Sequence, residues 1–195
     1  NIFDEHGFRV ILDYGHNEAA VGAMVDLVER LNPLGRRIVC VTCPGDRRDE
    51  DVRAIARTVA GHFNTYICHG DDNPRGRAPG EVPEMLRAEL IEAGVPEEAI
   101  IVAGSEETSI DTALGMARPT DLVMVFCDAI TRSWKQIIYF RPKEAPEPPS
   151  PGSSSDRRLR APRPSPRPAG PGRRARSGCR PVRARPWRRA SGSRS

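Results

Sequence analysis

The polar segment Asp13–Asn17 places an acid, a glycine, an imidazole and an amide between a short apolar run and a helical pattern over 19–31. The N-terminus of a helix offers free N–H donors and a partial positive charge. This corner therefore suits a nucleotide, with Asp13 accepting from ribose hydroxyls while His16 and Asn17 face the base or the phosphates. In the alternative interpretation, Asp13 and Asn17 only cap the helix and His16 packs against it.

A second charged segment, Thr42–Asp49, follows the next apolar run. Gly45 permits a sharp turn, and the guanidinium of Arg47 has the fork geometry that binds a carboxylate or phosphate through two hydrogen bonds. Alternatively the segment is a solvated charge run, in which Asp49 caps the following helix and Arg48 pairs with a neighbouring acid. The residues alone leave both interpretations open.

The third segment, 68–80, holds two acids, an amide and two arginines braced by Gly and Pro. These side chains can bind a zwitterion, with an arginine holding the carboxylate and the acids holding the cationic end. The candidates are Asp72, Asn73 and Arg75. The alternative is a surface loop whose charges pair with one another.

The elements that position these segments alternate between strand and helix. The predicted strands are 9–13, 37–42, 65–68, 99–102 and 121–127, with a last edge strand at 137–140; the predicted helices are 19–31, 49–60, 81–93 and 106–116. Such alternation predicts an α/β, Rossmann-like three-layer fold with a mostly parallel sheet and helices on both faces. Ligands of such sheets gather at the carboxyl ends of the strands. The loops of interest are therefore 13–17, 42–49, 68–80 and 128–133.

No metal site and no catalytic residue is predicted. Cys40 and Cys43 form a C-x-x-C pair, but a redox pair normally opens a helix and a structural zinc needs two further ligands. Reduced, buried thiols of a cytoplasmic protein are the favoured interpretation. The sequence has neither G-x-x-x-x-G-K-[ST] nor G-x-G-x-x-G, and so no phosphate-binding loop of its own.

The C-terminal part of the chain has a net charge opposite in sign to that of the rest. Residues 151–195 contain fourteen Arg, no Lys and one acid, and carry +13, whereas the remaining 16 basic and 25 acidic residues give −9. With so few large apolar residues the Pro/Arg-rich part cannot offset the entropy of ordering it. We predict a folded domain over 1–141 and a disordered tail over 142–195, whose composition is typical of a GC-rich gene read in a shifted frame. No apolar run is long enough for a membrane span.

Together and in order, the three loops resemble the C-terminal domain of the Mur ligases and folylpolyglutamate synthetases. Asp-Tyr-Gly-His-Asn at 13–17 is similar to the D-Y-A-H-N-P signature that opens that domain, with Gly15 in place of Ala and Glu18 in place of Pro. The segments 44–51 and 71–81 resemble the cyanophycin synthetase branch most closely. The Asp72–Arg75 stretch also resembles the amino-acid-binding loop of the diaminopimelate- or lysine-adding Mur ligase.

The resemblance implies a Rossmann-like domain with a six-stranded sheet, in a ligase that activates a carboxylate as an acyl phosphate for attack by an amine. It implies that Asp13, His16 and Asn17 contact ATP. It also implies that Arg47, Asn73 and Arg75 grip the incoming amino acid, which is arginine in the cyanophycin branch. We add Asp72 to this second set for the cationic end.

The same resemblance implies that magnesium and the phosphates are held by a central P-loop domain that is not in this sequence. The expected partners are therefore the central and ATP-grasp domains and the amino acid, and the chain alone is expected to be inactive. Two alternatives are a peptidoglycan-type Mur ligase domain and a protein that binds nucleic acid through its Arg-rich tail. The acidic body and the single aromatic residue of the tail, Trp187, disfavour nucleic acid.

Overall fold

The computed structural model describes residues 1–141, and the predicted tail over 142–195 lies outside these described residues. A six-stranded sheet forms the centre, in the order β1-β2-β6-β3-β4-β5. Its strands are β1 (Ile2–Phe3), β2 (Arg9–Asp13), β3 (Arg37–Val41), β4 (Thr65–Cys68), β5 (Ile100–Val102) and β6 (Leu122–Phe126). Only β1 runs antiparallel to its neighbour within this sheet; the other pairings are parallel.

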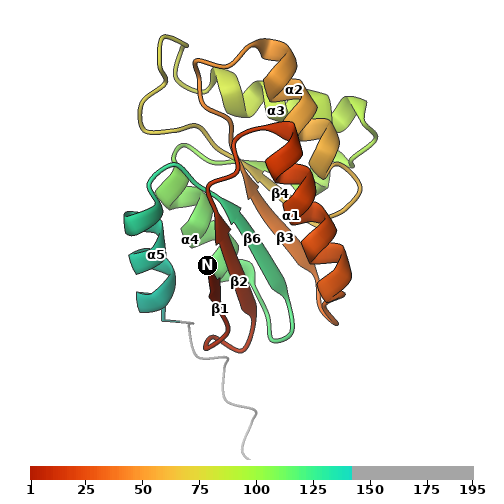
Figure 1. Cartoon of the computed structure of the whole chain (residues 1–195), viewed down its shortest axis with the longest axis vertical. Coiled ribbons are helices and arrows are strands. Elements are labelled where there is room, and N and C mark those ends of the chain that lie inside the picture. Colours follow the sequence, from red (N-terminus) through yellow and green to blue (C-terminus); the bar gives the residue numbers. More distant parts are fainter. Residues whose placement is uncertain (142–195) are drawn as a thin grey trace, which may run out of the picture. The chain divides into compact units, whose positions relative to one another are not determined.

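Helices cover both faces of this sheet and make the three layers (Figure 1). The helices are α1 (Glu18–Leu31), α2 (Asp49–Val59), α3 (Glu81–Glu92), α4 (Glu106–Met116) and α5 (Ile130–Tyr139), with a short 3₁₀ turn at Glu97–Ala99. One face packs against α1, α2 and α3, and the other against α4 and α5. The predicted α/β, mostly parallel class is confirmed.

Strand alternation explains why both faces are buried. In β3, Val39 and Val41 join the core on the α1–α3 side, whereas Ile38 and Cys40 join the core on the α4–α5 side. Successive side chains of a strand point to opposite faces, so a strand covered on both sides is apolar throughout. This is why the inner strands appear in the sequence as continuous apolar runs.

Two predicted features of the local structure are wrong. The edge strand predicted at 137–140 lies largely in α5, which buries Ser133 and Ile137 at helical spacing and leaves Tyr139 74% exposed. A run of four apolar residues does not distinguish a strand from a helix. Asp49 does not cap α2, because it is the first residue of that helix and its carboxylate accepts a hydrogen bond from Arg77.

The turn between α2 and β4 depends on one buried hydroxyl. Tyr66 is 1% exposed, and its oxygen accepts hydrogen bonds from the backbone N–H groups of Gly61 (2.9 Å) and Phe63 (3.2 Å). We expect Tyr66→Phe to lower the free energy of unfolding by about 1–3 kcal/mol, because it leaves these donors without a partner. Urea unfolding measures the loss; Tyr139→Phe is the matched control at an exposed position, and an equal loss there would contradict the explanation.

Candidate functional site

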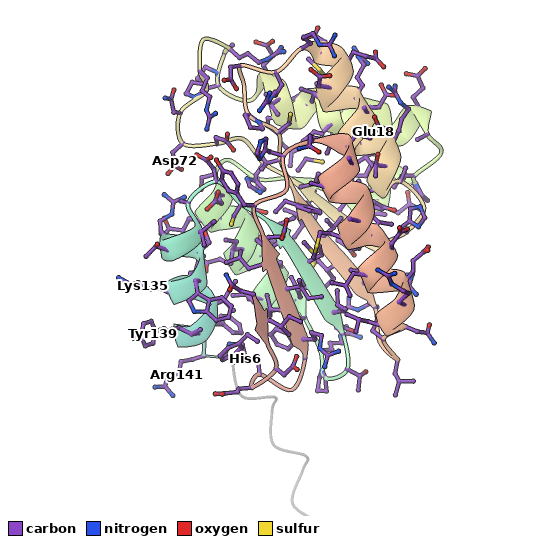
Figure 2. All side chains as sticks on the ribbon, viewed as in Figure 1. His6, Glu18, Asp72, Lys135, Tyr139 and Arg141 are labelled. Carbon is purple, nitrogen blue, oxygen red and sulfur yellow. The ribbon has the colours of Figure 1, made fainter. Side chains whose placement is uncertain are left out.

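The strand order brings the polar loops together at the carboxyl edge of the sheet. Because β6 lies between β2 and β3, the segment 127–133, which is the loop 127–129 with the first turn of α5, separates the loop 13–17 from the loops 42–49 and 69–80. In Figure 2, the side chains of Asp72 and Glu18 lie toward this end of the molecule, and His6 and Arg141 lie at the opposite end. The predicted convergence of the loops at one edge is therefore confirmed, with 127–133 at its centre.

The loop 13–17 is held by its own side chains. Asp13 Oδ1 accepts from the backbone N–H of Gly15 (2.7 Å), and Asn17 Oδ1 accepts from Ala20 N (3.0 Å) and so caps α1. His16 is half-buried, and its Nδ1 lies 3.1 Å from the carbonyl oxygen of Tyr14. The capping interpretation thus holds for Asn17, whose amide oxygen is already used.

Part of this loop is still available to a ligand. Within residues 1–141, Asp13 Oδ2 and His16 Nε2 make no hydrogen bond, and Tyr14 is 45% exposed, with its ring in a T-shaped contact with the His16 imidazole. A carboxylate oxygen, an imidazole nitrogen and an exposed ring suit a ribose and a base. The loop contains no Lys or Arg for phosphates. The chemistry of these residues thus suits neutral polar groups and a ring rather than phosphates.

Arg75 lies among three carboxylates from three loops. Its Nη2 donates to Asp128 Oδ1 (3.1 Å), Nη1 lies 3.5 Å from Asp46 Oδ1, and Nη2 lies 3.9 Å from Asp71 Oδ2. Although partial burial opposes it, these carboxylates raise the pKa of the guanidinium above its ordinary value. Within the described residues, the guanidinium of Arg75 makes one hydrogen bond, to Asp128, out of the five N–H donors that it carries. Arg75 therefore retains donors for a ligand carboxylate.

Arg77, which the sequence interpretation did not single out, joins the second and third loops. Its guanidinium donates to the carbonyl oxygens of Gly45 (2.8 Å) and Arg47 (2.7 Å) and to the carboxylates of Asp49 and Glu81. Its side chain is 14% exposed and its donors are used within the protein. Arg75 and Arg77 therefore differ in role although they are two residues apart.

Gly45 shows how closely these loops approach. A Cβ added at Gly45 would lie 2.9 Å from the carbonyl carbon of Pro74 and closer still to its oxygen. A side chain at this position would force the two loops apart. The requirement for glycine thus comes from packing between loops rather than from the sharp turn that the sequence indicated.

The other predicted amino-acid-binding residues occupy three different settings. Asn73 Oδ1 accepts from the backbone N–H of Arg75 (3.0 Å) and supports its left-handed backbone, with a φ of 49°. Asp72 pairs with Arg132 of α5. Arg47 is exposed, and its guanidinium makes no hydrogen bond within the described residues. Arg48 pairs with Asp51 as the alternative interpretation expects.

Sequence reasoning also missed Asp71, which is the buried member of the acid pair. Its side chain is 1% exposed, its Oδ1 accepts from Thr42 Oγ1 (3.1 Å), and its Oδ2 has no hydrogen-bond partner within the described residues. Burial, reinforced by Asp128, raises the pKa of this carboxyl above its ordinary value. Its position shortly after a buried strand, which ends at Cys68, was the available signal.

A cavity of about 680 Å³ lies beside the third loop. It is lined by 70–74, by 77–80 with the start of α3, by 102–105 at the end of β5, and by Cys43 and Gly45 of the second loop. This volume falls within the range of small-molecule sites. Asp72 and Asn73, two of the predicted amino-acid-binding residues, are in the lining.

The cysteines of the described residues add no further site, and neither do their metal-ligating side chains. Cys40, Cys43, Cys68 and Cys127 are buried free thiols, and burial raises the pKa of each to about 12. Such thiols stay protonated and unreactive at neutral pH. The described residues contain no group of three His, Cys, Asp or Glu that can hold a metal, and no helix among them has the length and apolarity to cross a membrane.

The fold and the site together define the class of this protein: an α/β domain with a mostly parallel sheet and with its polar loops at the carboxyl edge. The family model of the Mur ligase, glutamate ligase domain matches residues 1–128. The chain therefore belongs to this family.

Individual relatives agree with this assignment. The chain is 34% identical over 137 residues to the cyanophycin synthetase of Geminocystis herdmanii, an alignment that covers 70% of this chain and 15% of that protein. It is 32% identical over 121 residues to the UDP-N-acetylmuramoyl-L-alanyl-D-glutamate–2,6-diaminopimelate ligase of Brucella melitensis, covering 62% and 23%. The chain thus spans less than a quarter of the length of either relative.

The fold also matches a solved structure. E. coli FolC in complex with DHPP and ADP superposes with a TM-score of 0.52 and 21% sequence identity, over 67% of this chain and 28% of that one. This likeness shows a shared fold.

Proposed function

We propose that this chain is the C-terminal domain of an ATP-dependent ligase of the cyanophycin synthetase type, which joins arginine to the aspartate side chains of a poly-aspartate backbone. In this role the domain closes over ATP and presents arginine to the activated carboxylate. The observation that carries the proposal is the meeting of loops 13–17 and 69–80 at Asp128, with loop 42–49 reaching Arg75 through Asp46, in a domain of this family.

The nucleotide side of the proposal rests on the loop 13–17. The free oxygen of Asp13 and the free Nε2 of His16 are suited to a ribose and a base, and Asn17 supports them by capping α1. FolC, with the same fold, was solved with ADP. ATP supplies the phosphoryl group that activates the carboxylate, and its phosphates and magnesium would be held by a domain beyond this chain.

The amino-acid side of the proposal rests on Arg75, with Asn73 bonded to its backbone and with Asp72 and Arg47 in the same two loops. Arg75 keeps N–H donors for the α-carboxylate of arginine. The carboxylates Asp46, Asp71 and Asp128 outnumber it and favour a ligand that also carries positive charge. Arginine, with a cationic side chain, meets both conditions.

A second candidate is a diaminopimelate-adding Mur ligase domain. It is favoured by the Asp72–Arg75 stretch and by the similarity to the Brucella melitensis ligase. Diaminopimelate is also a zwitterion, but at its far end the positive charge of an ammonium group is cancelled by a second carboxylate. The acid excess around Arg75 disfavours that group.

A chimera tests the proposal and separates the two candidates. Residues 1–141 replace the corresponding segment of the Geminocystis herdmanii cyanophycin synthetase, and arginine-dependent ADP release is measured with a poly-aspartate primer. We expect turnover with arginine and none with diaminopimelate or with the 195-residue chain alone. Robust magnesium-dependent ADP release by the isolated chain, or a chimera that prefers diaminopimelate, would contradict the proposal.

The nucleotide role of the first loop predicts a selective effect on ATP. In the chimera, Asp13→Ala or His16→Ala should raise the KM for ATP by about tenfold, the equivalent of one lost charge-assisted hydrogen bond. The KM for arginine should change little. Glu18→Ala is the control, because Glu18 is exposed at the start of α1 on the same edge. Equal effects on both substrates would argue against a nucleotide role.

A further inference from the structure

Glu106 is a buried carboxylate that the proposed function does not use. It is the first residue of α4, and its side chain is 1% exposed. A carboxylate in this position benefits from the partial positive charge at the start of a helix, but its burial requires further hydrogen-bond donors.

The donors come from the loop that follows β6 and from the first turn of α5. Glu106 Oε2 accepts from the backbone N–H groups of Asp128 (2.7 Å) and Ala129 (3.3 Å). Glu106 Oε1 accepts from Ser133 Oγ and from Arg132 Nη2, the latter at 3.3 Å. Ala129 is the N-cap of α5 and provides no side-chain cap, so Glu106 supplies that function from another helix.

These bonds also keep Glu106 ionised. Burial disfavours the charged form, but the donors from Ser133, Asp128 and Ala129 outweigh it and hold the pKa of Glu106 below its ordinary value. The side chain of Glu106 is therefore negatively charged at neutral pH, and it is held in place by the four hydrogen bonds that it accepts.

The anchored segment reaches both predicted ligand loops. Asp128 Oδ1 accepts from Arg75 Nη2 (3.1 Å) and lies 3.5 Å from the hydroxyl of Tyr14, which donates to it. Arg132 pairs with Asp72. Glu106 thus contacts Asp128 and Arg132, which pair with Arg75 and Asp72, although these two residues lie 31 and 34 positions before Glu106 in the sequence.

We propose that Glu106 is a positioning residue, which fixes Asp128 and Arg132 and through them sets where Arg75 and Asp72 of the amino-acid loop stand. This inference rests on the proposed role of that loop in binding arginine. Without the carboxylate, the segment 128–133 loses its anchor, and the guanidinium of Arg75 loses the acceptor that fixes its orientation.

Glu89 offers a matched comparison within the same chain. It is also a buried helical carboxylate, 5% exposed, and it pairs with Arg53 (3.0 Å) and Arg57 (2.7 Å) of α2. Both partners lie on α2, and the other side-chain bond that they make within the described residues, from Arg57 to Glu50, stays on that helix. Replacing Glu89 removes a buried charge of the same kind without touching the site.

The experiment compares Glu106→Gln and Glu89→Gln in the 195-residue chain by NMR. The Nε–H signal of Arg75 and the backbone amides of 71–80 report the position of the loop, and titration with L-arginine gives a Kd. We expect Glu106→Gln to move the Arg75 signal toward that of a free arginine side chain and to raise the Kd about tenfold. We expect Glu89→Gln to leave both unchanged while still lowering stability.

Two results would overturn the inference. One is a Glu106→Gln spectrum that changes only at 128–133 and leaves 71–80 as in the wild type; the other is an equal change in Glu89→Gln. If Glu106→Gln does not fold, Arg132→Leu is used instead, because it breaks the contact with Asp72 at a partly exposed position. The Arg75 Nε–H signal and the amides of 71–80 should then move in Arg132→Leu; if they do not, the inference is wrong. If arginine leaves the wild-type spectrum unchanged, the proposed binding role fails, whereas the Arg75 signal still tests the role of Glu106.

Discussion

Replacing Asp121 by Asn is expected to lower the free energy of unfolding by about 3 kcal/mol at pH 7. Asp121 is 4% exposed and accepts from the backbone N–H groups of Arg36 (2.7 Å) and Arg118 (2.9 Å). It also accepts from Nε (3.1 Å) and Nη2 (2.7 Å) of Arg36. Asn lacks the charge and turns an NH₂ group toward these donors. The loss falls at the lower end for a broken buried pair because Arg36 is 35% exposed.

The effect of Asp121→Asn should depend on pH with a defined sign. Burial disfavours the charged form, but the hydrogen bonds from Arg36 and Arg118 hold the pKa of Asp121 below its ordinary value. A depressed pKa stabilises the fold above the unfolded-state pKa of about 3.9, and this stabilisation disappears as the pH falls through the folded-state value. The difference in the free energy of unfolding between the wild type and Asp121→Asn should therefore have its maximum at neutral pH and become smaller below about pH 4.

Urea unfolding at neutral and acidic pH measures this difference. Asp4→Asn is the control, because Asp4 pairs with Arg9 (2.8 Å) at the surface, where such pairs contribute less than about 1 kcal/mol. A deficit for Asp121→Asn that persists unchanged in acid would show that its charge is not the cause.

The second large effect concerns amino-acid recognition. In the chimera, Arg75→Lys is expected to raise the KM for arginine by about ten- to a hundredfold, which corresponds to about 1.5–3 kcal/mol for a charge-assisted pair. Lysine keeps the charge but lacks the planar fork that reaches Asp128 and a ligand carboxylate together. The KM for ATP should change little.

Arg48→Lys is the control for this substitution. Arg48 is 80% exposed and pairs only with Asp51 of its own helix within the described residues. Steady-state kinetics with both substrates should separate the two variants. If Arg75→Lys leaves both KM values unchanged, the third loop is a surface loop with paired charges, as the alternative interpretation has it.

Local pattern was sufficient to predict most elements of this fold. The bounds of β2, β4 and α4 agree with the predicted ranges, because continuous apolar runs and helical spacing are strong local signals. The two-residue strand β1 was missed since it is too short to show a period. The run at 137–140 was misassigned because the buried partners of Ile137 in α5 lie elsewhere in the chain.

The candidate site was less predictable, for a physical reason. The loops 13–17, 42–49 and 68–80 were identified from residue types, but the insertion of β6 between β2 and β3 depends on tertiary packing. That insertion puts Asp128 between Tyr14 and Arg75 and brings Glu106 beneath it. Arg77 and Glu106 therefore carry no distinctive local signal, and Asp71 has only its place shortly after a buried strand, although all three determine where the predicted residues stand.

The division of the carboxyl edge into a nucleotide loop and an amino-acid loop is tested most directly by mapping both ligands on the 195-residue chain. Backbone and arginine side-chain NMR signals are followed while L-arginine and a non-hydrolysable ATP analogue are added separately. We expect arginine to shift the signals of 45–48, 71–80 and Arg75, and the ATP analogue to shift those of 13–17. Shifts confined to the opposite end of the sheet, around His6 and Arg141, or identical maps for the two ligands, would contradict this division.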